Sequence, residues 1–197
     1  MAEKIIPRWE WRTFGKAFGA AEAKIQAQPQ GSVKKSVEKY ILSAKSDENC
    51  KIRDDLMDVK SLQQVNSDKL EQWYPTLKEG FPISKESISK LFKEYFKVAV
   101  PKLEQESYTY NEFVALVEKQ PDLRVVDVVK ERFIYTINDA IVEIANATFN
   151  GVPDRTVCVE HIDPALVIKT VRELGLEGYQ NINYIQAMKR AVGLKRG

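Results

Sequence analysis

The chain has 197 residues, of which 44% are hydrophobic and 29% are charged, so it can bury the core of one domain of ordinary to large size. Its 30 Lys and Arg residues nearly balance 28 Asp and Glu residues, and the net charge of +2 argues against nucleic acid or an anionic membrane as a partner. The sequence shows neither a signal-like start nor an apolar run of about 18 residues, which predicts a cytoplasmic protein that does not span a membrane.

The N-terminal third predicts strands around one helix. Alternation predicts a first strand, and an Ala-rich segment that ends before Pro29 and Gly31 predicts a helix. A second strand and a hairpin about the turn Asp54-Asp55 follow. The expected ranges are 6–14 for the first strand, 16–26 for the helix, 32–44 for the second strand, and 50–53 with 56–62 for the hairpin.

The middle of the chain is predicted to be helical. Ser84 can cap one helix, and Thr109 and Glu112 have capping-box spacing at the start of another that ends before Pro121. The first of these helices carries an apolar stripe for a core, formed by Ile88, Leu91, Phe92, Tyr95 and Phe96. Residues 73–75, Trp-Tyr-Pro, are interpreted as a packed turn.

The last third predicts three strands and two helices. The strands are expected at 124–137, 140–149 and 154–162, with turn pairs at 138–139 and 150–151. Asp163 and Pro164 predict the cap and first turn of a helix that runs to about residue 174. A short helix over 183–192 is closed by Gly193.

Several predicted strands have one charged face and one apolar face. In the first strand, Arg8, Glu10 and Arg12 alternate with Trp9 and Trp11, and successive side chains of a strand point to opposite faces. The other charged positions with this pattern are Lys51, Arg53, Asp58, Lys60, Lys130, Arg132, Glu143 and Glu160. Such faces are either solvated, as on an open sheet, or line the interior of a closed barrel.

The amphipathic helices favour the barrel, because they need the apolar strand faces to cover. We therefore predict an α+β fold with a closed or nearly closed antiparallel β-barrel, a tunnel with a charged interior and helices packed outside. Desolvating ions costs several kcal/mol, so a charged interior must be wet and filled by counter-charge. A polyanion chelated to a divalent cation would meet both requirements, with Lys and Arg on phosphate oxygens and carboxylates on the metal.

The order of these segments resembles a known family. WEWR, SVEKYIL, KIRDDLMDVKSL, VVKERF, CVEHIDP, LVIKTVRELGL and NINYIQAMKRAVG follow one another as in the CYTH superfamily, the triphosphate tunnel metalloenzymes, over nearly the whole chain. Its members include class IV adenylate cyclases, thiamine triphosphatases and inorganic triphosphatases. The resemblance implies a single CYTH-like domain over 1–197, a homodimer, and a triphosphate or nucleotide-like small molecule as ligand.

The resemblance also implies site residues. The family's N-terminal ExExK strand aligns with Arg8, Glu10 and Arg12, so Arg8 stands where a metal-binding glutamate is expected and should favour bare phosphate over metal. The implied metal ligands, for Mg²⁺ or Mn²⁺, are Glu10, Glu143 and Glu160, while Asn146 and Cys158 lie near positions where another carboxylate is expected. The implied phosphate-binding residues are Arg8, Arg12, Lys51, Arg53, Lys60, Lys130 and Arg132, and the implied catalytic residues are Glu10, Arg12 and Lys60.

Three functions follow. The first is divalent-dependent hydrolysis, or a related phosphoryl or nucleotidyl transfer, on a triphosphate-bearing substrate. This chemistry needs no protein nucleophile. The sequence agrees, because its one histidine is His161 and its two cysteines, Cys50 and Cys158, lie far apart. The second is a tunnel that binds polyphosphate or phosphorylated ligands without turnover. The third is a structural or interaction protein with solvated charged faces.

Overall fold

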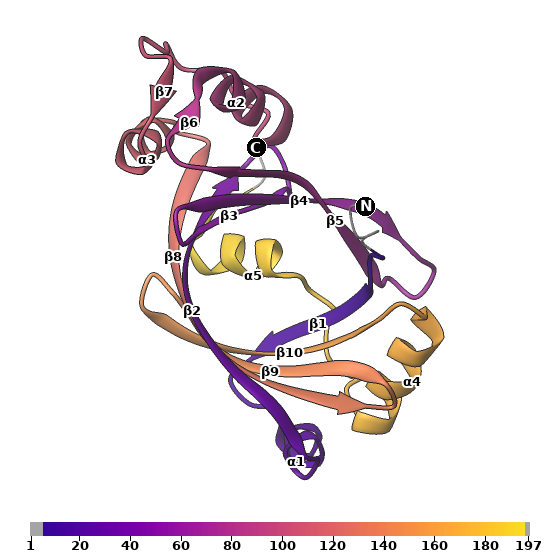
Figure 1. Cartoon of the computed structure of the whole chain (residues 1–197). Helices are drawn as coiled ribbons and strands as arrows, with labels where there is room; N and C mark the ends of the chain where they lie inside the picture. The colour runs from indigo at the N-terminus through magenta and orange to yellow at the C-terminus, as the bar shows by residue number, and fades with distance from the viewer. Residues whose placement is uncertain (1–5, 196–197) are drawn as a thin grey trace. The chain divides into compact units, whose positions relative to one another are not determined.

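Eight antiparallel strands close into a barrel in the computed structural model, which describes residues 6–195 (Figure 1). The hydrogen-bonded order is β1-β10-β9-β8-β2-β3-β4-β5, and β5 pairs with β1. The strands are β1 (Trp9–Gly15), β2 (Gln30–Ser43), β3 (Asn49–Arg53), β4 (Leu56–Val65), β5 (Glu71–Gly80), β8 (Leu123–Ile137), β9 (Ala140–Phe149) and β10 (Val152–His161). The predicted α+β barrel is confirmed.

The chain divides into two compact units. The first comprises Met1–Ser36, Leu62–Tyr74 and Val129–Tyr184, and the second comprises Val37–Ser61, Pro75–Val128 and Ile185–Gly197. The expectation of one domain over 1–197 stays a prediction. Within residues 6–195, no helix is long and apolar enough to cross a membrane.

The first unit packs two helices, α1 (Gly19–Gln26) and α4 (Pro164–Leu174), against strands. As predicted, Asp163 caps α4, since its side chain accepts a hydrogen bond from the Ala165 amide, and Gly175 ends the helix in the left-handed region with φ 78°. Trp11 of β1 shares a buried apolar cluster with Val171 of α4. This packing leaves the charged residues of β1 on the other strand face.

In the second unit, helices likewise pack against the apolar faces of strands. Its helical elements are α2 (Lys85–Lys90), a π-helical turn (Leu91–Tyr95), α3 (Tyr110–Glu118) and most of α5 (Tyr184–Ala191), and a small sheet pairs β6 (Ile83–Ser84) with β7 (Ser107–Tyr108). The predicted caps at Ser84 and Thr109 are present. Ile52 and Met57, from the β3–β4 hairpin, pack with Phe92 of the predicted apolar stripe, which is buried along its whole length.

The turns follow from side chains that tolerate positive φ. Asp54 and Asp55 join β3 to β4 with φ of 52° and 55°, and Asn138 and Asp139 join β8 to β9 with φ of 52° and 62°. Positive φ at both central residues is the type I′ turn that suits two-residue hairpins.

One predicted element is wrong. Residues 73–75 do not form a turn but lie inside β5. Proline is tolerated in a strand where its nitrogen needs no ladder partner, and Pro75 lies beyond Glu71 and Gln72, the residues of β5 that pair with β1.

Candidate functional site

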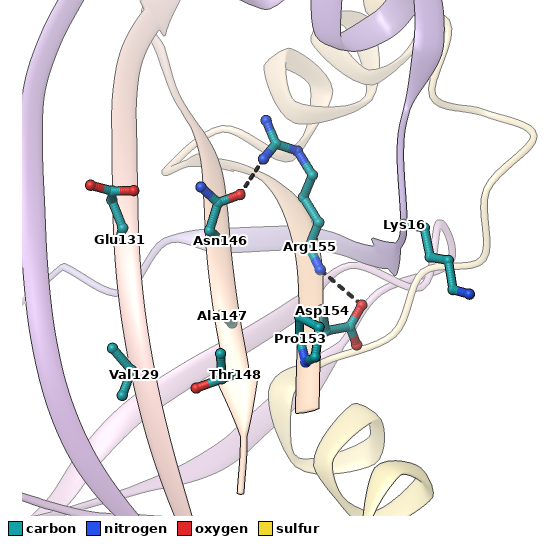
Figure 2. A pocket seen from close by; sticks show the side chains of 9 residues that line it. All are labelled: Lys16, Val129, Glu131, Asn146, Ala147, Thr148, Pro153, Asp154 and Arg155. Atoms are coloured by element: carbon teal, nitrogen blue, oxygen red, sulfur yellow. Dashed lines mark hydrogen bonds between the residues drawn. The ribbon is translucent and has the colours of Figure 1, made fainter. Parts of the chain in front are cut away.

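A cavity of about 620 Å³ lies beside β8, β9 and β10 in the first unit (Figure 2). Its lining residues are Lys16, Val129, Glu131, Asn146, Ala147, Thr148, Pro153, Asp154 and Arg155. Asn146 accepts a hydrogen bond from Arg155, which also pairs with Glu22 of α1. Asn146 therefore lines this cavity and makes its contact with Arg155, away from the acidic residues described next. The mixed charges of the lining do not select an anion.

The predicted charged residues of the first unit meet through strand register. Glu10 of β1 lies directly opposite Glu160 of β10, and Arg12 lies opposite Cys158. Cys158 in turn lies opposite Glu143 of β9. Directly opposed residues point to the same face, so these five side chains share one face of three adjacent strands.

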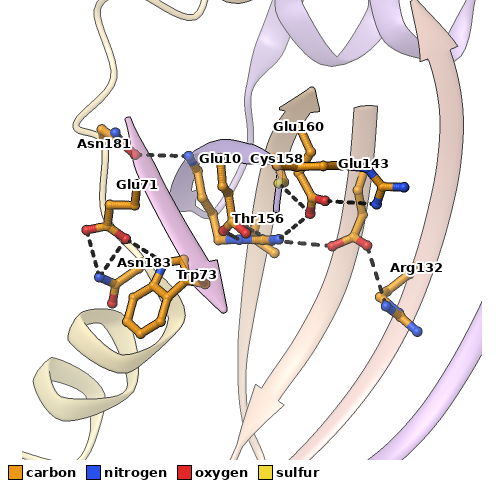
Figure 3. A network of polar contacts seen from close by, with 12 residues as sticks. Glu10, Glu71, Trp73, Arg132, Glu143, Thr156, Cys158, Glu160, Asn181 and Asn183 are labelled. Carbon is orange, nitrogen blue, oxygen red and sulfur yellow. Dashed lines mark hydrogen bonds and ion pairs between the residues drawn. The ribbon is translucent and has the colours of Figure 1, made fainter. Parts of the chain in front are cut away.

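Arg12 contacts acidic residues of this face from all three strands, and Figure 3 shows three of them, Glu10, Glu143 and Glu160. Its Nε donates to Glu10 Oε1 at 2.7 Å, and its Nη1 donates to Glu143 Oε1 and Thr156 Oγ1, both at 3.3 Å. Its Nη2 lies 4.0 Å from Glu160 Oε1. One guanidinium thus contacts carboxylates from three strands.

Arg12 is also buried, with 5% of its surface exposed. Burial alone would lower its pKa, but the neighbouring Cys158, Glu10 and Glu143 raise the pKa of Arg12 well above its ordinary value. Lys130 is similarly buried, at 6%. This face of the first unit is therefore not a solvated surface, which removes the main support for the third function considered above.

The segment before α5 holds Arg12 in place. Asn181 Oδ1 accepts from the Arg12 amide at 3.0 Å, and the Ile182 amide donates to the Arg12 carbonyl at 2.7 Å. The Tyr184 ring centroid lies 4.6 Å from Arg12 Cζ and 4.2 Å from Lys130 Nζ. Two cations stacked on one aromatic ring are attracted by its negative faces, so Tyr184 fixes both.

Glu10, Cys158 and Glu160 form a group with the donor set of a metal site. One ligand atom from each lies within 4.8 Å of the others. Burial, and then the charge of Glu10, raises the pKa of Glu160. Cys158 Sγ donates to Glu160 Oε1 at 3.4 Å, and burial raises the pKa of this thiol. Burial and the charge of Glu10 both disfavour the ionised form of Glu160, and a bound cation would offset them.

The remaining predicted residues of the first unit pair with these acids. Arg8 Nη1 lies 3.8 Å from Glu160 Oε2, with half of the Arg8 side chain exposed. Arg132 Nη1 lies 3.8 Å from Glu143 Oε2. Glu143 is therefore held by two arginines and lies outside the group of three donors, so its role as a metal ligand stays a prediction.

The predicted bases of the second unit gather on the β3–β4 hairpin. Lys51 Nζ lies 3.9 Å from Asp58 Oδ2, and Arg53 Nη1 lies 3.4 Å from Glu38 Oε1. Burial lowers the pKa of Lys51, and the charges of Lys60 and Arg53 lower it further, against the opposing effect of Glu38 and Asp58. Burial and the two neighbouring cations disfavour the charged form of Lys51, and a bound anion would favour it.

The sequence interpretation missed polar residues on β5 and near α5. Glu71 lies opposite Glu10. Its carboxylate accepts from Asn183 Nδ2 at 3.0 Å to each oxygen and from Trp73 Nε1 at 3.0 Å. Glu71 and Trp73 are two residues apart, as are residues on one face of a strand, and this spacing is the signal in the sequence. The predicted turn at residues 73–75 leaves it unused.

Solved structures share the fold of this closed barrel. An adenylyl cyclase from Hippeastrum, whose title reports a dominant triphosphatase activity, aligns with TM-score 0.51 and 11% identity over 93% of this chain and 96% of its own. A protein from Pyrococcus horikoshii OT3 aligns with TM-score 0.50 and 14% identity over 92% of this chain and 99% of its own.

These similarities show the fold. No protein-family model and no curated protein matches the sequence. The chain has the fold of CYTH-type proteins, so the resemblance stated from the sequence is confirmed at the level of the fold.

Proposed function

We propose that this protein is a divalent-cation-dependent phosphohydrolase, or a related phosphoryl- or nucleotidyl-transfer enzyme, that acts on a triphosphate-bearing substrate. One observation carries the proposal: Glu10 and Glu160 face each other on neighbouring strands, where burial, and then the charge of Glu10, raises the pKa of Glu160. The triphosphatase activity reported for the Hippeastrum protein of the same fold supports the class of substrate. The cytoplasmic location and the homodimer expected from the sequence stay predictions.

The carboxylates of the first unit would hold the cation. Carboxylate oxygens suit Mg²⁺ and Mn²⁺, so Glu10 and Glu160 are the proposed ligands, with Glu143 as a further candidate. When bound, such an ion supplies positive charge that polarises a phosphoryl group and orients a water molecule.

The bases of the first unit would bind phosphate oxygens. Arg12 and Lys130 are held by Tyr184 and by the acids around Arg12, so they are positioned before substrate arrives. Arg8 and Arg132 are more exposed and can exchange their carboxylate partners for phosphate. Fixed charges of this kind stabilise the charge that develops on the transferred phosphoryl group without a protein nucleophile.

The bases of the second unit are a separate part of the proposal. Lys51, Arg53 and Lys60 are proposed to bind phosphate, with Lys60 also catalytic, because the lowered pKa of Lys51 indicates a cluster that an anion would stabilise.

The test is phosphate release from tripolyphosphate by the full chain with Mg²⁺, with Mn²⁺ and with chelator. We expect release that needs the metal, since the carboxylate group fits a cation. Release that continues undiminished in chelator would contradict the role of the metal. ATP and thiamine triphosphate, assayed in parallel, separate the substrate alternatives.

A second function, phosphate binding without turnover, is favoured by a specific observation. Arg8 pairs with Glu160, and Arg12 donates to Glu10, so the protein's own cations partly satisfy the proposed metal ligands. This function predicts that tripolyphosphate stabilises the fold in chelator by about 2.7 kcal/mol at about 100 times its Kd. Thermal unfolding with and without tripolyphosphate measures this, and an unchanged Tm in both chelator and metal would rule it out.

A further inference from the structure

We propose that Ser36 of β2 binds a phosphoryl oxygen of the ligand together with Lys130 and Arg132 of β8. The inference deepens the proposed function and rests on it for one point, that the ligand carries phosphate groups. It adds a neutral hydroxyl group to a set of binding residues that were predicted from their charge alone.

Strand alternation places Ser36 on the same strand face as these two bases. β2 and β8 are neighbours in the barrel, and Lys35 Nζ of β2 lies 2.9 Å from Glu131 Oε1 of β8. Side chains that meet across neighbouring strands share a face, and the next residue along each strand points to the opposite face. Ser36 therefore shares a face with Lys130 and Arg132, which flank the paired glutamate, and all of these residues belong to the first unit.

Two buried polar atoms on this face indicate a ligand. Within residues 6–195, Ser36 Oγ and Arg132 Nε are buried and have no hydrogen-bond partner. A buried donor without a partner costs free energy, so folded proteins rarely leave one unpaired. The Arg132 guanidinium is oriented by Glu143, whose Oε2 lies 3.8 Å from Nη1 (Figure 3). Direct and diagonal neighbours on two strands have Cβ atoms about 5–8 Å apart, so one bound group can reach both unpaired atoms.

The chemistry of these groups selects an oxyanion. An arginine Nε and a lysine ammonium can only donate hydrogen bonds, and a serine hydroxyl can donate as well. Donors that share one face fit a partner that offers acceptors, and a phosphoryl oxygen combines an acceptor with negative charge. Lys130 is held on this face by stacking on the Tyr184 ring, so it adds a positive charge in a fixed place.

The strand order places Ser36 apart from the proposed metal ligands. β9 and β8 lie between β10, which carries Glu160, and β2, which carries Ser36. At about 4.8 Å between neighbouring strands, Ser36 and Glu160 are roughly 14 Å apart along the sheet. The hydroxyl therefore binds a phosphoryl group away from the cation, and its contribution to affinity should be the same with metal and in chelator.

The test is calorimetric binding of tripolyphosphate to the full chain in chelator. We expect Ser36→Ala to raise the Kd about tenfold, the effect of losing one hydrogen bond to a charged group, and the same ratio with Mn²⁺ present. Ser36→Thr keeps the hydroxyl and should stay within about twofold of the wild type. The matched control is Ser32→Ala, which removes an exposed hydroxyl from the same strand and face and should leave the Kd unchanged.

Thermal unfolding of the ligand-free variants separates binding from a structural role. A buried hydroxyl that has no partner in the free protein does not stabilise it, so Ser36→Ala should keep or raise the Tm. A lower Tm together with an unchanged Kd would show that the hydroxyl is satisfied inside the fold, for instance by a buried water, and would overturn the inference.

The outcomes distinguish this inference from the proposed function. Tripolyphosphate binding that depends on Ser36 supports the inference even if no metal supports phosphate release. A wild-type Kd in Ser36→Ala overturns the inference and leaves the proposed function standing if release still needs the metal. The absence of tripolyphosphate binding to the wild type in chelator overturns it as well.

Discussion

Glu10→Gln is expected to lower metal-dependent phosphate release from tripolyphosphate by about 100-fold or more. The amide keeps the shape of the side chain and removes the negative charge that the proposed cation needs. Glu10 is half-buried, its Oε1 accepts from Arg12 Nε at 2.7 Å, and it belongs to the group of three donors with Cys158 and Glu160. The initial rate at saturating metal and substrate measures the loss, and calorimetry should show weaker Mn²⁺ binding in the same variant.

Glu131→Gln is the matched control for this change. Glu131 lies on β8 in the same unit and pairs with Lys35, at 2.9 Å, but by strand alternation its side chain faces away from Lys130 and Arg132. The Glu131→Gln variant should keep the wild-type rate of phosphate release. Undiminished activity in Glu10→Gln would show that the assignment of this residue to the metal is wrong.

Alternation of charge predicted which faces carry the site. Residues 8–12 and 158–160 have the period of a strand, and a local period is enough to assign Glu10, Arg12 and Glu160 to one face each. The capping signals at Ser84, Thr109 and Asp163 were equally local and were confirmed.

Register could not be predicted, because it is set between segments far apart in the chain. Nothing in the sequence near Glu10 indicates that Glu160 lies opposite on one neighbour and Glu71 on the other. The same holds for Tyr184, whose ring supports Arg12 from a segment that the sequence assigned only to a helix end. Strand β5 was missed because Pro75 has no N–H to donate to a neighbouring strand, so a proline argues against a strand when the pairing is not known.

Arg12→Met is expected to destabilise the fold by about 3–5 kcal/mol, the cost typical of removing one partner from a buried ion pair. The methionine fills much of the same space but leaves Glu10 and Glu143 without the cation that now binds both. Urea unfolding in chelator measures the loss. Arg8→Met is the control: Arg8 carries the same charge and reaches Glu160 at 3.8 Å, but half of its side chain is exposed, so the loss should be about 0–1 kcal/mol.

The double variant Glu10→Gln with Arg12→Met tests whether the loss comes from uncompensated charge. Since Arg12→Met leaves the Glu10 carboxylate without its 2.7 Å partner, neutralising Glu10 in that background should recover part of the lost free energy. If the two losses simply add, the Arg12 guanidinium contributes through packing on Tyr184 rather than through the carboxylates. A coupling between the two changes would instead show that Arg12 supplies the charge that lets acids from neighbouring strands share one buried face.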